Sequence, residues 1–296
     1  MSSSAFKIGK LAIGTVQFGL DYGVANHNGR LTIEEGKKVL AVANGAGVDT
    51  LDTAIAYGDS EATLGKIGVA KWHIVSKLPK MPDDISDVDG WVETQIVGSL
   101  NRLKVARLDG LLLHFPTQIF SGQGRKLPVA LQKSKEKGLV KKIGASIYEP
   151  NELPALLDVF EVNLIQSPLN ILDRRLIESG WLERLTVAGV EVHVRSIFLQ
   201  GLLLMPESQR PGKFAQWQSL WVVWDSWLRQ NNLSALEASL RFALDFENVS
   251  KVVIGIDSVN QMQQILSVPS QSLPVLPNFG DLIDKRLLNP SVWSQL

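Results

Sequence analysis

The feature that most constrains this chain is a regular alternation between short apolar runs and longer segments with helical periodicity. The short runs are rich in Val, Ile and Leu, as buried parallel strands are, and the longer segments repeat apolar residues at the spacing of amphipathic helices. Eight such runs occur, near residues 10–14, 48–52, 72–77, 108–113, 139–145, 161–166, 190–195 and 251–256. Eight βα units close naturally into a barrel. We therefore predict an α/β protein with a (β/α)8 TIM barrel fold.

The length of 296 residues fits one such barrel, because about 250 residues suffice for the fold. We expect residues 1–296 to form a single domain, since no linker or charge block divides the chain. Two segments exceed what the scaffold needs. One is the long stretch 199–250 after the seventh run, where Pro206–Lys213 could be a lid, and the other is the tail 274–296, which we expect near the barrel mouth.

The amino-acid composition limits the kinds of molecule that this protein is expected to bind. Thirty basic and thirty acidic residues leave no net charge to attract nucleic acid or an anionic membrane, so we expect a small-molecule partner. There is no cysteine, no apolar run near 18 residues and no secretory start, which favours a cytoplasmic protein. His27, His73 and His193 show no ligand spacing, so we predict no metal site. A monomer is favoured, and a dimer is possible.

The sequence predicts where two helices begin. Thr32 and Glu35 have the spacing of a capping box, and the helix that they begin should stop near Gly45. The next helix has Ser86 in position to cap it. It carries an apolar stripe formed by Val88, Val92, Ile96, Leu100 and Leu103.

Four residues capable of chemistry follow three successive runs. Asp52, Lys77 and His114 stand at or just past the run ends, and Tyr57 comes five residues after Asp52. The carboxyl ends of parallel strands meet on one face of a barrel, so these side chains should converge. A nearby lysine would stabilise a phenolate, a carboxylate would hold that lysine charged, and an imidazole could donate to a carbonyl oxygen. Such a set suits protonation of a carbonyl oxygen while hydride, which no side chain supplies, arrives from a nicotinamide or flavin.

These residues also carry a resemblance. The segment Asp52-Thr53-Ala54 through Tyr57-Gly58, with Glu61 and Leu64-Gly65 after it and Lys77 and His114 further on, resembles the first signature of the aldo-keto reductase family. The resemblance implies a (β/α)8 fold, a nicotinamide cofactor bound without a Rossmann domain, and Tyr57 as the general acid. The implied function is an NAD(P)H-dependent oxidoreductase that reduces an aldehyde, ketone or sugar carbonyl, or catalyses the reverse reaction.

The resemblance continues at later strand ends and implies a set of cofactor contacts. They are Gly14, Thr15, Ser146, Gln166, Arg195, Ser196, Gly201, Gly255, Asp257, Ser258 and Gln261. Three positions depart from the family pattern: Ile147 replaces an asparagine, Arg195 replaces an aromatic residue that stacks on the nicotinamide, and 255–261 lacks a cation for the 2'-phosphate of NADP. The resemblance favours NADP(H). NAD(H) stays open because Asp257 could accept from a ribose hydroxyl.

Aromatic residues suggest two further roles. Phe18 and Phe115 adjoin strand-end motifs, so we expect them to line the mouth and contact substrate. Trp217, Trp221 and Trp224 share one helical face. Core packing is the favoured interpretation of that face, and an aromatic substrate wall or a subunit contact is the alternative.

Two other functions compete with the reductase. Lys77 could form a Schiff base in a barrel aldolase, because a strand-end lysine can act as a nucleophile. Alternatively, the altered positions 147 and 195 could mark a slow or inactive nicotinamide-binding sensor or regulatory protein with the same fold.

Overall fold

The computed structural model describes residues 8–26 and 29–296 and contains a closed barrel of eight parallel strands in chain order. β1 pairs with β8 to close the ring, with Leu11 opposite Val252 and Gly14 opposite Gly255. Each predicted run overlaps one strand, so the predicted fold class is confirmed. The strands are β1 (Leu11–Gly14), β2 (Thr50–Asp52), β3 (His73–Leu78), β4 (Leu108–Leu113), β5 (Val140–Ser146), β6 (Leu164–Pro168), β7 (Glu191–Arg195) and β8 (Lys251–Gly255).

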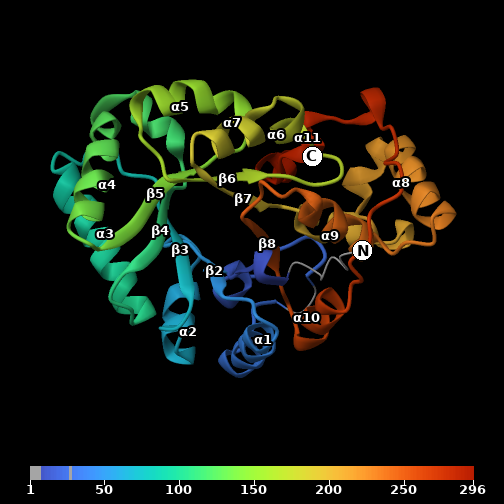
Figure 1. Cartoon of the computed structure of the whole chain (residues 1–296), viewed down its shortest axis with the longest axis horizontal. Coiled ribbons are helices and arrows are strands. Elements are labelled where there is room, and N and C mark those ends of the chain that lie inside the picture. The colour runs from blue at the N-terminus through green and yellow to red at the C-terminus, as the bar shows by residue number, and fades with distance from the viewer. Residues whose placement is uncertain (1–7, 27–28) are drawn as a thin grey trace.

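Helices surround the barrel, and α8 and α9 lie on the side remote from α3 and α4 (Figure 1). The order of elements alternates strand and helix through most of the chain, as a barrel of this type requires. The helices are α1 (Ile33–Gly45), α2 (Ser60–Ile67), α3 (Val88–Leu103), α4 (Leu127–Glu136), α5 (Leu153–Val159), α6 (Arg175–Glu178), α7 (Trp181–Val187), α8 (Gln218–Gln230), α9 (Ala235–Asp245), α10 (Val259–Leu266) and α11 (Lys285–Leu288). Within the described ranges, none of them has the length and apolarity that crossing a membrane requires.

Of the two predicted helix N-caps, one is confirmed and the other is wrong by one residue. The Thr32 hydroxyl accepts from the Glu35 amide at 3.2 Å while the Glu35 carboxylate accepts from the Thr32 amide, so the capping box is confirmed. α3 is capped by Asp87, whose Oδ1 accepts from the Gly90 amide at 3.0 Å, and not by Ser86. A cap must lie within reach of the amide three residues on, and Ser86 lies one position too early. The predicted α3 stripe is buried throughout.

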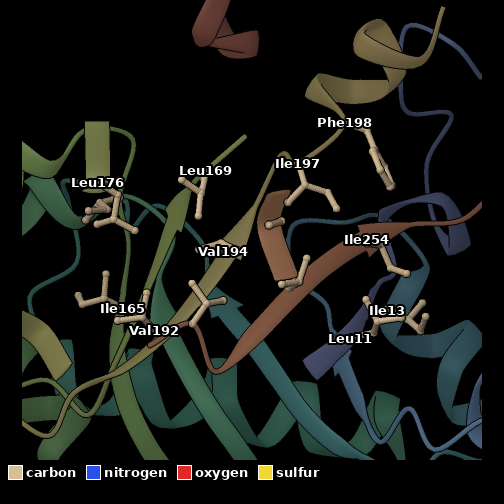
Figure 2. Packing of buried hydrophobic residues seen from close by; sticks show 14 of the residues in the cluster. Leu11, Ile13, Ile165, Leu169, Leu176, Val192, Val194, Ile197, Phe198 and Ile254 are labelled. Atoms are coloured by element: carbon tan, nitrogen blue, oxygen red, sulfur yellow. The ribbon is translucent and has the colours of Figure 1, made fainter. Parts of the chain in front are cut away.

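The hydrophobic core consists of one large cluster and a second, small cluster of Val75, Leu112 and Leu164 from β3, β4 and β6. All four residues of β1 are buried, as in parallel strands that have helices outside and side chains inside. Figure 2 shows Leu11 and Ile13 of β1 near Ile254 of β8, and Val192 and Val194 along β7, all five of them in the large cluster. These five side chains have no exposed surface.

The tryptophan face of α8 and the segment before it belong to the core. Trp221 and Trp224 are at most 1% exposed, and their indole N–H groups donate to Phe214 O at 3.0 Å and Leu203 O at 3.2 Å. Trp217 is also buried. The core interpretation is therefore confirmed, because buried indoles with satisfied N–H groups have a structural role.

The remaining histidines take structural positions. His193 is buried with Nε2 at 2.8 Å from the Glu191 carboxylate, and the largely exposed His73 pairs with Asp109. His27 lies outside the described residues. Across the described part of the chain, no cluster of three or more His, Asp or Glu side chains could hold a metal ion.

Candidate active site

A cavity of about 770 Å³ opens at the carboxyl ends of the strands, a size typical of small-molecule and cofactor sites. All eight strands contribute to it, which follows from their parallel order around a closed barrel. One lining residue at or just past each strand end is, in chain order, Gly14, Asp52, Lys77, His114, Ser146, Gln166, Arg195 and Gly255. The tail also reaches the cavity, through Pro290 and Ser291, as expected. A lid role for Pro206–Lys213 stays a prediction.

A buried ion pair forms the floor of the site. Lys77 is 1% exposed, and its Nζ donates to Asp52 Oδ1 at 2.6 Å and to Thr53 O at 2.9 Å. Gln166 Nε2 donates to the other Asp52 oxygen at 2.7 Å, and the Ser146 hydroxyl donates to Gln166 Oε1 at 3.3 Å. Both oxygens of Asp52 are thus occupied, as a buried carboxylate requires. The chain of bonds links β2, β3, β5 and β6 into one rigid base.

Tyr57 and His114 lie directly beside this pair. Their rings meet edge to face with centroids 5.8 Å apart, and Lys77 Nζ lies 5.3 Å from the centre of the Tyr57 ring. The loop that carries Tyr57 is held by the loop after β1, since a Cβ added at Gly19 would lie only 2.0 Å from Tyr57 O. The structure therefore brings the four residues predicted as catalytic into one cluster.

The protonation states favour proton donation. Burial, and then the Asp52 charge, raise the pKa of Tyr57, and Arg195 opposes them. Burial, with the charges of Lys77 and Arg195, lowers the pKa of His114 to about 4. Burial also lowers the pKa of Lys77, against the attraction of Asp52. At neutral pH the phenol is protonated and the imidazole is neutral.

Lys77 and Arg195 differ in how they act on the phenol. Arg195 is the cation that lowers the pKa of Tyr57. Lys77 is held 2.6 Å from Asp52, whose charge opposes its own. That Lys77 also stabilises a Tyr57 phenolate stays a prediction.

Arg195 is fixed in orientation at the end of β7. Its guanidinium lies over the Tyr148 ring, 4.8 Å from the centroid. One terminal nitrogen donates to Ile147 O at 3.0 Å and the other to the Ser196 hydroxyl at 3.2 Å. Arg195 makes no ion pair with any described carboxylate, although its side chain is half-buried.

The opposite part of the cavity is formed by the ends of β1 and β8 and by α10. Gln261 Oε1 accepts from the Asp257 amide at 2.8 Å. Asp257 Oδ1 and Gln17 Oε1 are buried and have no hydrogen-bond partner among the described residues. Burial raises the pKa of Asp257. Both residues line this end of the cavity, and each has one buried acceptor oxygen without a donor among the described residues.

Some of the residues predicted to contact the cofactor do not line the cavity, or already use their polar group in a hydrogen bond within the protein. Ser258 caps α10 by accepting from the Gln261 amide at 3.2 Å and does not line the cavity. Thr15 lines the cavity, but its hydroxyl donates to Asp52 O at 3.0 Å. Ser196 and Gly201 line the cavity, and their contact with a cofactor stays a prediction.

One of the two predicted substrate residues is wrong. Phe18 is 1% exposed and packs below α1, where a Cβ added at Gly36 would lie 2.7 Å from its ring. It lies in a tight turn after β1 that directs its ring to the helix layer and not to the mouth. Phe115 is 43% exposed, lines the cavity and has its ring centroid 5.3 Å from that of His114.

The sequence analysis missed several polar lining residues, among them Gln17, Tyr22, Tyr148 and Gln200. Tyr148 lies two positions past the strand-end Ser146, and Gln17 and Tyr22 follow β1. The strand-end rule would have found Gln17 and Tyr148, had it been extended by three residues past the strands. Tyr22 and Gln200 lie further into the loops, beyond the reach of that rule.

Two loops far apart in sequence meet at the mouth of the cavity. The Val24 amide donates to Gln200 O at 3.2 Å, and Gln200 Nε2 donates to the Tyr22 hydroxyl at 3.0 Å across 178 positions. Leu199 and Gln200 have positive φ values of 48° and 54°, a conformation that side chains rarely adopt. The contacts between the loops hold this strained turn.

The fold and the site define a barrel protein whose polar cluster lies at the carboxyl ends of the strands. Residues 10–274 match the model of the Aldo/keto reductase family, so the chain belongs to this family. Members are oxidoreductases that generally use nicotinamide cofactors.

Individual relatives are distant. An aldo-keto reductase from Mycobacterium sp. (strain JLS) is 30% identical over 133 residues, which are 42% of this chain and 45% of that protein, so the match spans less than half of its length. Two solved structures are similar in fold at 20% identity. The aldo-keto reductase of Bacillus halodurans in its holo form has a TM-score of 0.67 over 89% of this chain and 87% of its own. The glycerol dehydrogenase of Gluconobacter oxydans has a TM-score of 0.66 over 90% and 88%.

Proposed function

We propose that this protein is an NAD(P)-dependent oxidoreductase that reduces an aldehyde, ketone or sugar carbonyl to an alcohol, or catalyses the reverse reaction, with Tyr57 as the general acid or base. The observation that carries the proposal is the cluster of a protonated Tyr57, a neutral His114 and the buried Lys77–Asp52 pair at one end of a cavity large enough for a cofactor and a substrate. This set of groups matches the proton transfer that carbonyl reduction needs.

The residues divide the work as follows. A nicotinamide, when bound, would be the source of the hydride that the carbonyl carbon receives. Tyr57 donates its phenolic proton to the carbonyl oxygen, and His114 donates a hydrogen bond to the same oxygen from one ring nitrogen, which a neutral imidazole can do. The phenolate that Tyr57 becomes is stabilised by the positive charges of Lys77 and Arg195. Asp52 keeps Lys77 charged and, with Thr53 O, fixes its direction.

The residues at the other end of the cavity fit a dinucleotide. Asp257 Oδ1 and Gln17 Oε1 are buried acceptors without donors, and ribose hydroxyls and the nicotinamide carboxamide bring donors. Gly255 leaves the cavity open beside Gln17, because a Cβ added there would lie 2.7 Å from Gln17 Nε2. Gln166 and Ser146 are the groups available to a carboxamide, and the apolar Leu236 and Ile265 line the same cavity.

The choice between the two nucleotides depends on charge. The described cations that line the cavity are Lys77 and Arg195, both near Tyr57, whereas Asp257 lies at the α10 end. A 2'-phosphate would meet Asp257 without a cation, and a 2'-hydroxyl could donate to it. Although the family resemblance favours NADP(H), this lining leads us to expect tighter binding of NADH.

The aldolase alternative is weakened by the state of Lys77. A Schiff-base lysine needs a neutral amine that a substrate can reach, but Lys77 is 1% exposed and donates to Asp52 and Thr53 O. The sensor alternative predicts tight nucleotide binding without turnover, so the experiment on the reductase also tests it.

Titration of NADH and NADPH into the protein, followed by energy transfer from its eight tryptophans to the reduced nicotinamide, tests cofactor binding. A panel of neutral and charged aldehydes, ketones and sugars then tests turnover. Asp257→Ser should shift the ratio of the two Kd values toward NADPH, because it removes a charge beside the 2'-position. Absence of binding by both nucleotides contradicts the reductase, and binding without turnover of any carbonyl favours the sensor.

A further inference from the structure

The charges around the reacting centre do not balance. Asp52 and Lys77 neutralise each other at 2.6 Å, and His114 is neutral at pH 7. Arg195 adds a positive charge that lines the same cavity and makes no ion pair within the described ranges. A half-buried guanidinium in a cavity without a carboxylate partner is available to an anion that enters.

The tyrosines of the chain collect around this cation. The sequence has three, Tyr22, Tyr57 and Tyr148, and all three line the cavity. The ring of Tyr148 supports the guanidinium plane at 4.8 Å, and the Tyr22 hydroxyl accepts from Gln200, which leaves its own proton available to donate. Phenol O–H groups and a guanidinium together form a site rich in donors.

Arg195 also has N–H groups that donate no hydrogen bond within the described part of the protein. A guanidinium has five N–H groups, and the two bonds to Ile147 O and the Ser196 hydroxyl use two of them. Those bonds and the Tyr148 ring fix the plane of the fork, so little side-chain entropy remains to be lost on binding. Fixed forks of this kind bind carboxylates and phosphates through two parallel hydrogen bonds.

The alternative that Arg195 stacks on the nicotinamide is disfavoured on two grounds. One face of the guanidinium already lies against Tyr148. In addition, the nicotinamide ring becomes positively charged when it gives up hydride, and a cation stacked on it would oppose that step.

We propose that Arg195, supported by Tyr148 and Tyr22, binds an anionic group on the substrate, so that the substrate is a small aldehyde or ketone with a carboxylate or a phosphate monoester. The anion anchors one end of the substrate while its carbonyl oxygen reaches Tyr57 and His114. This inference rests on the proposed function and specifies its substrate class.

Matched pairs of substrates test the charge requirement. Succinic semialdehyde and butanal differ by a carboxylate, and glyceraldehyde 3-phosphate and glyceraldehyde differ by a phosphate. The wild-type protein should favour one or both anionic members in kcat/KM. The pair with the larger ratio of anionic to neutral kcat/KM shows whether the site prefers a carboxylate or a phosphate.

Variants then assign the preference to Arg195. Because Arg195 also contributes charge beside the Tyr57 phenolate, Arg195→Gln should lower kcat for both members of a pair. The ratio of kcat/KM between the anionic and the neutral member should fall by about 10- to 100-fold, mainly through the KM of the anionic substrate, which is the range for loss of a charge-assisted bond. The Kd of the nucleotide should change by less than about threefold. Arg195→Lys should be intermediate, because it keeps the charge and loses the fork. The exposed Arg229, which contacts Ser226 outside the cavity, provides the control Arg229→Gln.

A binding measurement keeps the inference testable without turnover. Succinate and inorganic phosphate are titrated by calorimetry into the wild-type protein, Arg195→Gln and Tyr22→Phe, after thermal melting has confirmed that each variant is folded. Anion binding that is lost in Arg195→Gln supports the proposal. Equal treatment of charged and neutral substrates by the wild-type protein, or anion binding unchanged in Arg195→Gln, overturns it while leaving the reductase in place. Failure of both nucleotides to bind would instead count against the proposed function.

Discussion

The buried pair of Lys77 and Asp52 should be strongly coupled in stability. Its side chains are 1% and 6% exposed, and the charged atoms are 2.6 Å apart. At that distance the gross attraction is about 6 kcal/mol for an effective dielectric constant of about 20. Desolvation of both ions offsets much of this gain, but removal of one partner leaves the other charge buried alone. We therefore expect Lys77→Met and Asp52→Asn each to lower the free energy of unfolding by about 3–5 kcal/mol.

The double variant separates this coupling from simple loss of packing. Because it buries no unpaired charge, its loss should be smaller than the sum of the two single losses by about 2 kcal/mol or more. The assay is urea unfolding at pH 7, with unchanged m values as the condition for comparison. The pair Lys133–Asp89, with side chains 52% and 50% exposed, is the matched control and should couple by less than about 1 kcal/mol. Additive losses at Lys77 and Asp52, or single losses below about 1 kcal/mol, would refute the reasoning.

Three further predictions concern proton transfer, pH and packing. Tyr57→Phe should lower kcat by about 100- to 10,000-fold with little change in nucleotide Kd, measured by steady-state kinetics and titration; unchanged kcat would remove Tyr57 as the acid. The folded-state pKa of His114, about 4, lies below its unfolded value, so its contribution to stability is present above about pH 6.5 and is lost as the pH falls toward 4. His114→Gln should therefore lose less stability than the wild type between pH 7.5 and 4.5 in urea titrations; parallel losses would contradict this. Gly65→Ala should lower Tm markedly because its Cβ would lie 1.9 Å from Arg102 O, whereas Gly45→Ala, with nothing within 4 Å, should not; equal Tm changes would contradict the packing argument.

The barrel could be predicted from the sequence because its signals are periodic. Runs of Val, Ile and Leu marked every strand, and the capping box at Thr32 marked the start of α1. Asp52, Lys77 and His114 followed from the same reasoning, since a residue at the end of a parallel strand has its position in the barrel fixed by the strand. The strand register thus determined most of the reacting centre.

Residues in irregular turns could not be predicted in this way. Phe18 follows a strand as closely as Phe115 does, yet the turn after β1 directs its ring into the core below Gly36. Tyr22 reaches the cavity because its loop is held by Gln200, 178 positions further along the chain. Both outcomes depend on backbone angles and long-range contacts, and no periodicity encodes these.

The contact between the loops that carry Tyr22 and Gln200 has a consequence for the order of folding. A bond that spans 178 positions carries a large entropy of loop closure until β1 and β8 have paired and brought the two loops together. The strained turn at Leu199 and Gln200 is also unfavourable until its partners arrive. We therefore expect the mouth of the cavity to form last during folding, on a ring of strands that is already closed. In pulse-labelling hydrogen exchange the Val24 amide should gain protection after the amides of β8, and the nascent barrel should be unable to bind substrate until it does.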